Sequence, residues 1–170
     1  MATGHFRSIA FAALTLLATG SCATLSQIVQ PPEFTAASGR DTQLRLLAPS
    51  ASRPLGGASL RIWTRIRNPN AFGLTLAALR GNIFLENERA GEVDFPLGLP
   101  LAAAADTVVP LDINISFSDL PGLVGVAERI VTRNRVAYRV DGTVTVDAGA
   151  LGQPTFGPST WVSGESPVVR

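Results

Sequence analysis

The sequence feature that most constrains the fold is a strict two-residue alternation of apolar and polar side chains at residues 60–67. One face of this extended segment carries Leu60, Ile62, Thr64 and Ile66. The other face carries Arg61, Trp63, Arg65 and Arg67. Such alternation predicts a half-buried β-strand. We expect the strand to end at Asn68-Pro69-Asn70, because proline lacks the N–H that a ladder needs and asparagine tolerates turn dihedrals.

The same alternation recurs in later segments. It predicts a hairpin whose inward-facing residues are Ile83, Leu85, Val93 and Phe95. We expect the chain to turn at residues 89–91 and the second strand to end at Pro96 and Pro100. Long strands are predicted at 107–117 and 135–146, and weaker ones at 42–47 and 160–169.

One helix is predicted between the two long strands. Its N-terminus would be capped by Ser118 or Asp119, with Pro121 in the first turn, and Asn134 would end it. The predicted class is mainly β. About 130 residues in seven or so short strands suit an antiparallel fibronectin/Ig-like β-sandwich with one α-helix late in the chain, covering residues 41–170.

The composition excludes most catalytic chemistries. All 14 basic residues are arginine, and the single His and single Cys are His5 and Cys22. Residues after Cys22 therefore cannot form a Ser-His-Asp triad, a Ser-Lys dyad, a Schiff-base lysine or a zinc site with Cys or His ligands. We expect no cofactor and no metal. The formal net charge of +1 gives no case for nucleic acid.

Residues 1–21 are typical of a bacterial lipoprotein signal peptide. Arg7 precedes an apolar stretch of roughly 10 residues, whereas a membrane-spanning helix needs about 20. The sequence Thr19-Gly20-Ser21-Cys22 resembles a lipobox, which implies cleavage between Ser21 and Cys22 and lipidation of Cys22. An ordinary signal peptide with an incidental cysteine is the alternative. Loss of Arg7 leaves 13 arginines against 13 acidic residues.

A lipid on Cys22 would anchor the chain stably to a membrane. By analogy with lipoproteins generally, the absence of Asp after Cys22 favours the outer membrane of a bacterial cell envelope, facing the periplasm. Residues 22–40 then form the lipidated cysteine and a tether. The eighteen residues of the tether after Cys22, residues 23–40, extend to about 60 Å at most. In the alternative, Ile28, Val29 and Phe34 pack onto the domain.

Several motifs in their order resemble the late embryogenesis abundant type 2 family, also called the water stress and hypersensitive response (WHy) domain. They are the strand 60–67 running into Asn68-Pro69-Asn70, the strand 83–85, Gly91, the strand 108–117, and residues 138–144 with their central Gly142. The resemblance implies a fibronectin-like sandwich, a non-catalytic role in stress tolerance, and no active site to carry over. Asn68, Pro69 and Asn70 are interpreted first as turn-forming residues, with a ligand role as the alternative.

Two surface groups are candidate sites. The row Arg61, Trp63, Arg65 and Arg67 suits anionic lipid headgroups or an envelope protein, because arginine binds phosphate bidentately and stacks on tryptophan. The alternative is a solvated strand face with Trp63 covered. A second group comprises the hairpin carboxylates Glu86, Glu88, Glu92 and Asp94. Paired carboxylates can hydrolyse glycosides or bind Ca²⁺, and the alternative is a solvated edge.

These observations favour a lipid-anchored, non-catalytic envelope protein of WHy type that protects other macromolecules or binds them. One alternative is an accessory lipoprotein subunit of an envelope transport or assembly complex. A carboxylate-based hydrolase is the minor alternative.

Overall fold

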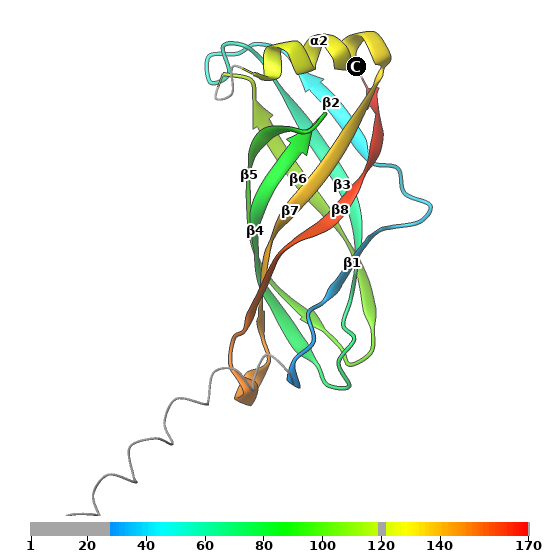
Figure 1. The fold of residues 1–170 in the computed structure, drawn as a ribbon, viewed down its shortest axis with the longest axis vertical. Coiled ribbons are helices and arrows are strands. Elements are labelled where there is room, and N and C mark those ends of the chain that lie inside the picture. Colours follow the sequence, from blue (N-terminus) through cyan, green and yellow to red (C-terminus); the bar gives the residue numbers. More distant parts are fainter. Residues whose placement is uncertain (1–27, 119–121, 170) are drawn as a thin grey trace, which may run out of the picture.

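The structure of the protein is a computed structural model that describes residues 28–118 and 122–169 (Figure 1). Along the chain the elements are β1 (Glu33–Ala36), β2 (Gln43–Leu47), β3 (Gly57–Arg67), β4 (Leu74–Leu85), β5 (Glu88–Leu101), β6 (Asp106–Ser116), α2 (Leu123–Arg133), β7 (Arg135–Asp147), the short 3₁₀ helix η1 (Gly149–Leu151) and β8 (Thr155–Val169). Within these ranges no helix has the length and apolarity that crossing a membrane requires. The predicted mainly-β class with a helix late in the chain is confirmed.

All eight strands belong to one sheet. In one half, β3 pairs with β6 along its whole length on one side, and with β2 and then β1 on the other. In the other half the order is β8-β7-β4-β5. The halves are joined where Leu44 and Arg45 of β2 pair in parallel with Val168 and Val169 of β8.

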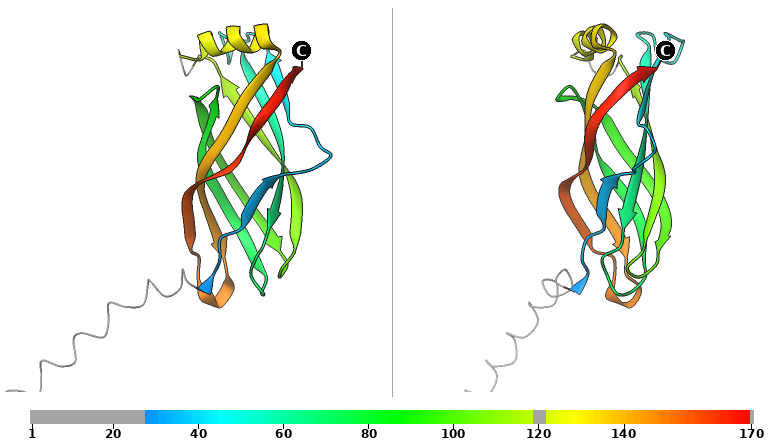
Figure 2. Two further views of the ribbon diagram at one scale, coloured as in Figure 1. Left: turned by 45° about the vertical axis from the view of Figure 1, so that its right-hand side comes forward. Right: turned by 90° about the vertical axis from the view of Figure 1, so that its right-hand side faces the viewer.

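The expected two-sheet sandwich is not confirmed. Because β2 is hydrogen-bonded to β8, both halves are parts of a single sheet that folds over and faces itself (Figure 2). The sheet is open, since in the described residues the outer strands β5 and β6 share no ladder.

The core lies between the two halves and takes one face of each strand. The alternation predicted for residues 60–67 is confirmed: Leu60, Ile62, Thr64 and Ile66 are each 0% exposed. The inward faces of β6 and β7 contribute Leu111, Ile113, Ile115, Val140 and Val144. Burying one such aliphatic side chain contributes about 1.5–3 kcal/mol. The core therefore depends on keeping the register of every strand.

The segment before residue 40 is packed onto the sheet. Val29 is completely buried, and β1 pairs with the end of β3. The Phe34 ring stacks on Trp161 of β8, with 5.9 Å between centroids. Ile28 stays 56% exposed. The structure therefore supports the alternative in which this segment packs onto the domain, through Val29 and Phe34.

The predicted turn at residues 89–91 is wrong. The chain turns at Glu86-Asn87, where both residues have positive φ (50° and 68°) and Leu85 pairs with Glu88. This is the backbone of a two-residue hairpin turn whose twist matches the strands. The pairing then shifts, because Ile83 faces Gly91 while Phe84 faces Arg89. Gly91 therefore follows a bulged residue, Ala90, and does not form the turn.

Pro96 and Pro100 do not close the hairpin strand as expected, because β5 continues through both to Leu101. Strand β5 pairs only with β4, so one of its edges needs no N–H donors. Proline is tolerated on such an edge strand.

The helix ends as predicted. Asn134 adopts the left-handed conformation (φ 54°), and its N–H donates to the Ile130 carbonyl oxygen. The N-cap is Gly122, so Ser118 does not cap the helix. Asp119 and Pro121 lie outside the described residues.

A close approach of β4 and β7 explains Gly142. Gly81 and Gly142 face each other across these strands. A Cβ on Gly142 would lie 2.7 Å from the Gly81 Cα and 2.7 Å from the Trp161 Cζ2. The Trp161 ring, which is 2% exposed, thus occupies the space that a side chain would need.

Replacement of Gly142 by Ala should lower the free energy of unfolding by about 2–3 kcal/mol, because neither the backbone nor the indole can move away freely. Urea denaturation followed by tryptophan fluorescence measures the change. The control is Gly73→Ala, whose new Cβ would be at an ordinary 3.6 Å from the Leu101 carbonyl oxygen and should cost nothing. Equal stability of the two variants would contradict this packing.

Candidate functional site

The Asn-Pro-Asn junction is a buried hydrogen-bond network at one end of the sheet. Asn68 is 0% exposed and Asn70 is 4% exposed. The Asn68 amide nitrogen donates to the carbonyl oxygens of Phe72 (2.8 Å) and Ala102 (3.0 Å). Its oxygen accepts from the backbone N–H of Asn70 (3.0 Å) and from the Asn70 side chain (2.9 Å). These contacts hold the 68–73 loop against the 101–105 loop.

Asn70 extends the network to the N-terminal segment. Its side-chain oxygen accepts from the Gln30 N–H (2.8 Å), and its side-chain nitrogen donates to the Gln30 carbonyl oxygen (2.9 Å). The amide thus pairs with one residue of backbone as a neighbouring strand would. The side-chain amides of both asparagines hold backbone segments together. This arrangement agrees with the interpretation of Asn68 and Asn70 as turn-forming residues. Gln30 carries no sequence signal for this contact, because it is 40 residues from Asn70.

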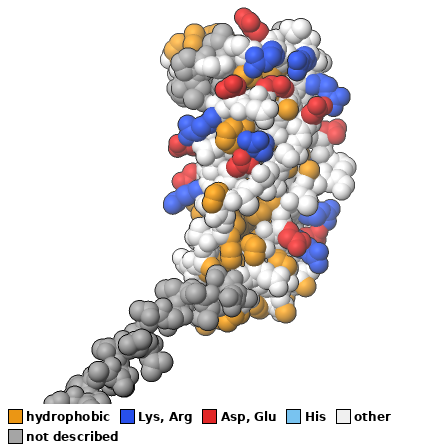
Figure 3. All heavy atoms as spheres, viewed as in Figure 1, with side chains coloured by type: hydrophobic (Ala, Val, Ile, Leu, Met, Phe, Trp, Pro, Cys, Tyr) orange, Lys and Arg blue, Asp and Glu red, His pale blue; other side chains and the backbone are white. Residues whose placement is uncertain are grey.

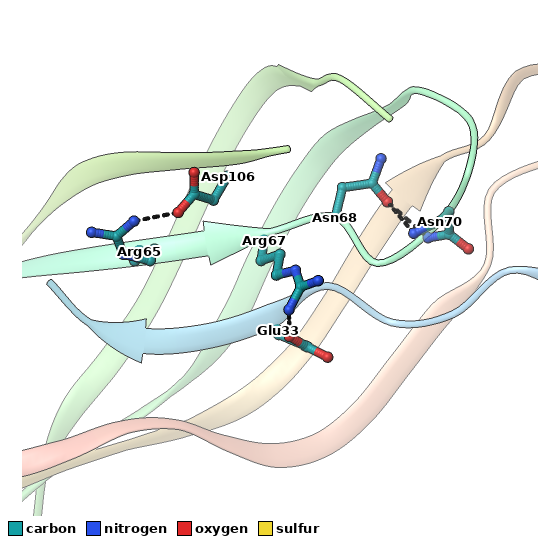
Figure 4. A network of polar contacts seen from close by, with 6 residues as sticks. All are labelled: Glu33, Arg65, Arg67, Asn68, Asn70 and Asp106. Atoms are coloured by element: carbon teal, nitrogen blue, oxygen red, sulfur yellow. Dashed lines mark hydrogen bonds and ion pairs between the residues drawn. The ribbon is translucent and has the colours of Figure 1, made fainter. Parts of the chain in front are cut away.

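Each arginine of the row on β3 has a carboxylate partner. Arg61 makes a bidentate pair with Asp112 of β6, at 2.6 and 3.1 Å. Arg65 pairs with Asp106. Arg67 lies 3.7 Å from Glu33 of β1, which it faces directly (Figure 4).

The pairing reduces the positive charge that the row presents to an anionic ligand. The hydrogen bond that Arg61 donates to Asp112, and the negative charge of Asp112, raise the pKa of Arg61 above its ordinary value. Exposed pairs of this kind contribute little to stability, because water screens their charges. Their main effect here is to balance the charge of the outer face.

Trp63 is half-buried, and the guanidinium group of Arg40 lies over its ring, 4.1 Å from the centroid. Arg40 precedes β2 and was not among the predicted site residues. The contact fits the alternative interpretation of the arginine row, in which the strand face is solvated and Trp63 is covered.

Two grooves lie on the outer face of this half of the sheet. One, of about 400 Å³, is lined by the ion-paired residues Glu33, Arg65, Arg67 and Asp106, with Thr35 and Ala104. The other, of about 360 Å³, is lined by Gln43, Arg45, Leu47, Arg53, Ser59, Arg61, Asp112 and Asn114. Arginine is thus the dominant charged residue of the second groove. Carboxylates in both grooves face arginine, which does not suit an acid–base pair.

Three of the four hairpin carboxylates also have arginine partners. Glu92 pairs with Arg89 at 2.6 Å, and Asp94 lies 3.4 Å from Arg80. Glu86 lies 3.7 Å from Arg133 and accepts a hydrogen bond from the Ala137 N–H at 2.9 Å. No group of three or more metal-ligating side chains occurs in the part of the chain that the structure describes. The hairpin therefore resembles a charged edge more than a catalytic or calcium site.

The family model for late embryogenesis abundant protein (LEA_2) matches residues 64–160, which is more than half of the chain. The chain belongs to this late embryogenesis abundant family. The match begins within β3 and includes the Asn68-Pro69-Asn70 junction, the hairpin, the helix and Gly142. Membership supports a non-catalytic, stress-related domain.

Two solved structures share the fold, and one of them is named as a late embryogenesis abundant protein. AT1g01470 from Arabidopsis thaliana has a TM-score of 0.60 at 15% identity, covering 84% of this chain and 85% of that one. At2g46140.1, named as a late embryogenesis abundant (LEA) protein, has a TM-score of 0.51 at 17% identity, covering 84% and 74%. Among curated proteins none matches the sequence.

The signal-cleavage and lipidation residues predicted from sequence, Ser21 and Cys22, lie outside the described residues.

Replacement of Asn68 by Asp should lower the free energy of unfolding by about 3 kcal/mol or more at neutral pH. The new carboxylate would be buried against the Phe72 and Ala102 carbonyl oxygens that now accept from the amide. Burial and these oxygens would raise the pKa of the carboxyl group in the folded state, so the loss should shrink as the pH falls through that raised pKa and reach its minimum below the unfolded value of about 4.

Denaturation with urea at several pH values measures this effect. Asn114→Asp is the matched control, because Asn114 is exposed on β6 and its change should stay within about 0.5 kcal/mol. A loss for Asn68→Asp no larger than for the control would show that the amide network is not structural.

Proposed function

We propose that this late embryogenesis abundant domain is a non-catalytic, stress-protective protein of the bacterial envelope, anchored to a membrane by a lipid on Cys22. The observation that carries the proposal is the position of the only cysteine. It follows Thr19-Gly20-Ser21 at the end of a secretory leader, and it stands seven residues before Val29, the first buried residue of the described chain.

The folded N-terminal segment shortens the tether. Because Val29 is buried and Gln30 is hydrogen-bonded to Asn70, the proposed tether spans only Cys22 to Ile28. Six residue spacings extend to about 20 Å, compared with about 60 Å for a tether that ends at residue 40. In the proposal the domain is held next to the membrane that carries it.

A non-catalytic role agrees with the chemistry of the surface. After Cys22 the chain has no His, Lys or thiol, and most carboxylates on the outer face are paired with arginine. A surface that presents paired charges and small polar groups suits weak contact with many macromolecules better than bond making. The proposed action is shielding of neighbouring envelope components during water stress.

Mass spectrometry of the protein from membrane fractions tests the anchor. The N-terminal peptide should begin at Cys22 and carry the mass of a diacylglyceryl group. Cys22→Ser should leave the protein without a lipid, whereas Ser21→Ala, which keeps a small residue before the cysteine, should still be processed. Unmodified Cys22 in soluble protein would contradict the proposal.

Freeze–thaw of a labile enzyme tests the protective role. The purified mature chain should preserve more activity than an equal mass of an unrelated β-sheet protein of similar net charge. Equal losses would contradict protection. Stoichiometric co-purification of an envelope protein with the lipidated chain, together with no protection, would favour an accessory subunit of an envelope complex.

A further inference from the structure

The end of the sheet at which the N-terminal segment joins the domain is formed by loops without charged residues. Four segments meet there: 28–32, 68–74, 98–105 and 148–156. We call this surface the uncharged end. None of the four contains Asp, Glu, Arg, Lys or His.

Hydrogen bonds join segments 28–32, 68–74 and 98–105 of the uncharged end, and segment 148–156 is held by hydrogen bonds within itself. The Asn70 side chain pairs with the Gln30 backbone, and the Ala104 N–H donates to the Asn70 carbonyl oxygen at 2.9 Å. In the 148–156 segment the Ala148 N–H donates to the Gly152 carbonyl oxygen at 2.9 Å. The loops are therefore parts of a built surface.

Small and apolar groups dominate the uncharged end. Ile28 is 56% exposed, and several alanines are exposed beside half-buried aromatic and leucine side chains. The exposed alanines are Ala71, Ala102, Ala103, Ala104 and Ala150. In Figure 3 apolar side chains gather at this lower end, while charged side chains lie mostly above it.

The opposite end of the sheet is charged. It carries Arg53 in the β2–β3 loop, Glu86 and Glu88 at the hairpin turn, and Glu128 and Arg129 on α2. The charges next to the uncharged end are Asp147, whose carboxylate accepts hydrogen bonds from Gly149 and Gln153, and those of the pairs Arg67–Glu33 and Arg65–Asp106. The molecule is thus polarised along its length.

We infer that the uncharged end rests on the lipid surface, with the charged end and α2 pointing away from it; the inference rests on the proposed lipid anchor. The anchor fixes the occupant, because a lipid on Cys22 is within about 20 Å of Ile28, which belongs to this end. Charged loops would lose hydration on close approach to the boundary between headgroups and acyl chains, and uncharged loops do not incur that cost. The absence of charge also makes the docking independent of anionic lipid.

The test uses the full mature chain, coupled through the Cys22 thiol to a maleimide-headgroup lipid in phosphatidylcholine vesicles. A ketone-bearing amino acid replaces Ala103 or Ser52, which are exposed at the two ends, and takes a ketone-specific nitroxide. Collisions with an aqueous nickel chelate are then measured by electron paramagnetic resonance. Coupling should lower the collision rate several-fold at position 103 and leave it unchanged at position 52.

Charge variants separate docking from mere nearness to the anchor. Ala71→Glu with Ala150→Glu should reduce the docked population about tenfold and restore collisions at position 103. The matched pair Ala48→Glu with Ala51→Glu, both exposed at the opposite end, should not.

Equal collision rates at the two positions, or protection that survives the Ala71→Glu and Ala150→Glu changes, would overturn the inference. Protection at position 103 that also appears without coupling would indicate a second copy of the chain and would overturn it too. Because the anchor here is synthetic, these outcomes do not depend on lipidation in cells. Unmodified Cys22 in cells would instead contradict the proposed function.

Discussion

One sheet supplies both walls of the core, so each strand can bury only alternate side chains. The constraint is visible in β3, where Leu60, Ile62 and Ile66 are fully buried and the residues between them are not. It also limits how closely the strands can approach. Where β4 meets β7, glycines stand on both strands, and Trp161 from β8 fills the space. Packing density is thereby kept without a second sheet.

The same constraint leaves a long polar face outside, and arginine suits that face. A guanidinium group can reach across one strand spacing and bind a carboxylate through two nitrogen atoms, as Arg61 does with Asp112. Other cross-strand arginine–carboxylate pairs, each with one nitrogen–oxygen contact, join β1 and β6 to β3 and also join β4 to β5. Their individual energies are small, but they reduce the positive charge of the arginine row on β3. An arginine row whose members are paired agrees with the non-catalytic, stress-related domain that family membership suggests better than with a strong anion site.

Alternation was sufficient to predict the central strands from sequence. Strands β3, β6 and β7 each bury one face, so their period is visible residue by residue. The end of the helix was equally visible, because Asn134 tolerates the left-handed conformation that ends α2. The family resemblance, carried by Asn68-Pro69-Asn70 and Gly142, is confirmed by the family model.

Other features depended on contacts that no local pattern reveals. Gly91 indicated a turn, but the left-handed residues are Glu86 and Asn87, and the glycine serves a bulge. Pro96 and Pro100 indicated a strand end, although an edge strand accommodates both. The single sheet was hidden because it depends on two residue pairs between β2 and β8, which are more than 120 residues apart. The carboxylate partners of Arg61 and Arg65 were hidden for the same reason.

In the proposed lipoprotein, the Asn70–Gln30 contact would link the fold to the orientation of the domain at the membrane. A lipid anchor alone restrains the distance of a domain from a membrane and leaves its orientation free. Here the chain is fixed to the sheet from Val29 onward by a buried side chain and by two hydrogen bonds to Gln30, so only six residue spacings separate Cys22 from Ile28. In the proposed lipoprotein, a short tether that leaves from an uncharged end would restrict orientation as well as distance. The junction that the sequence marks as a turn would then also determine which surface of the domain the proposed anchor brings to the membrane.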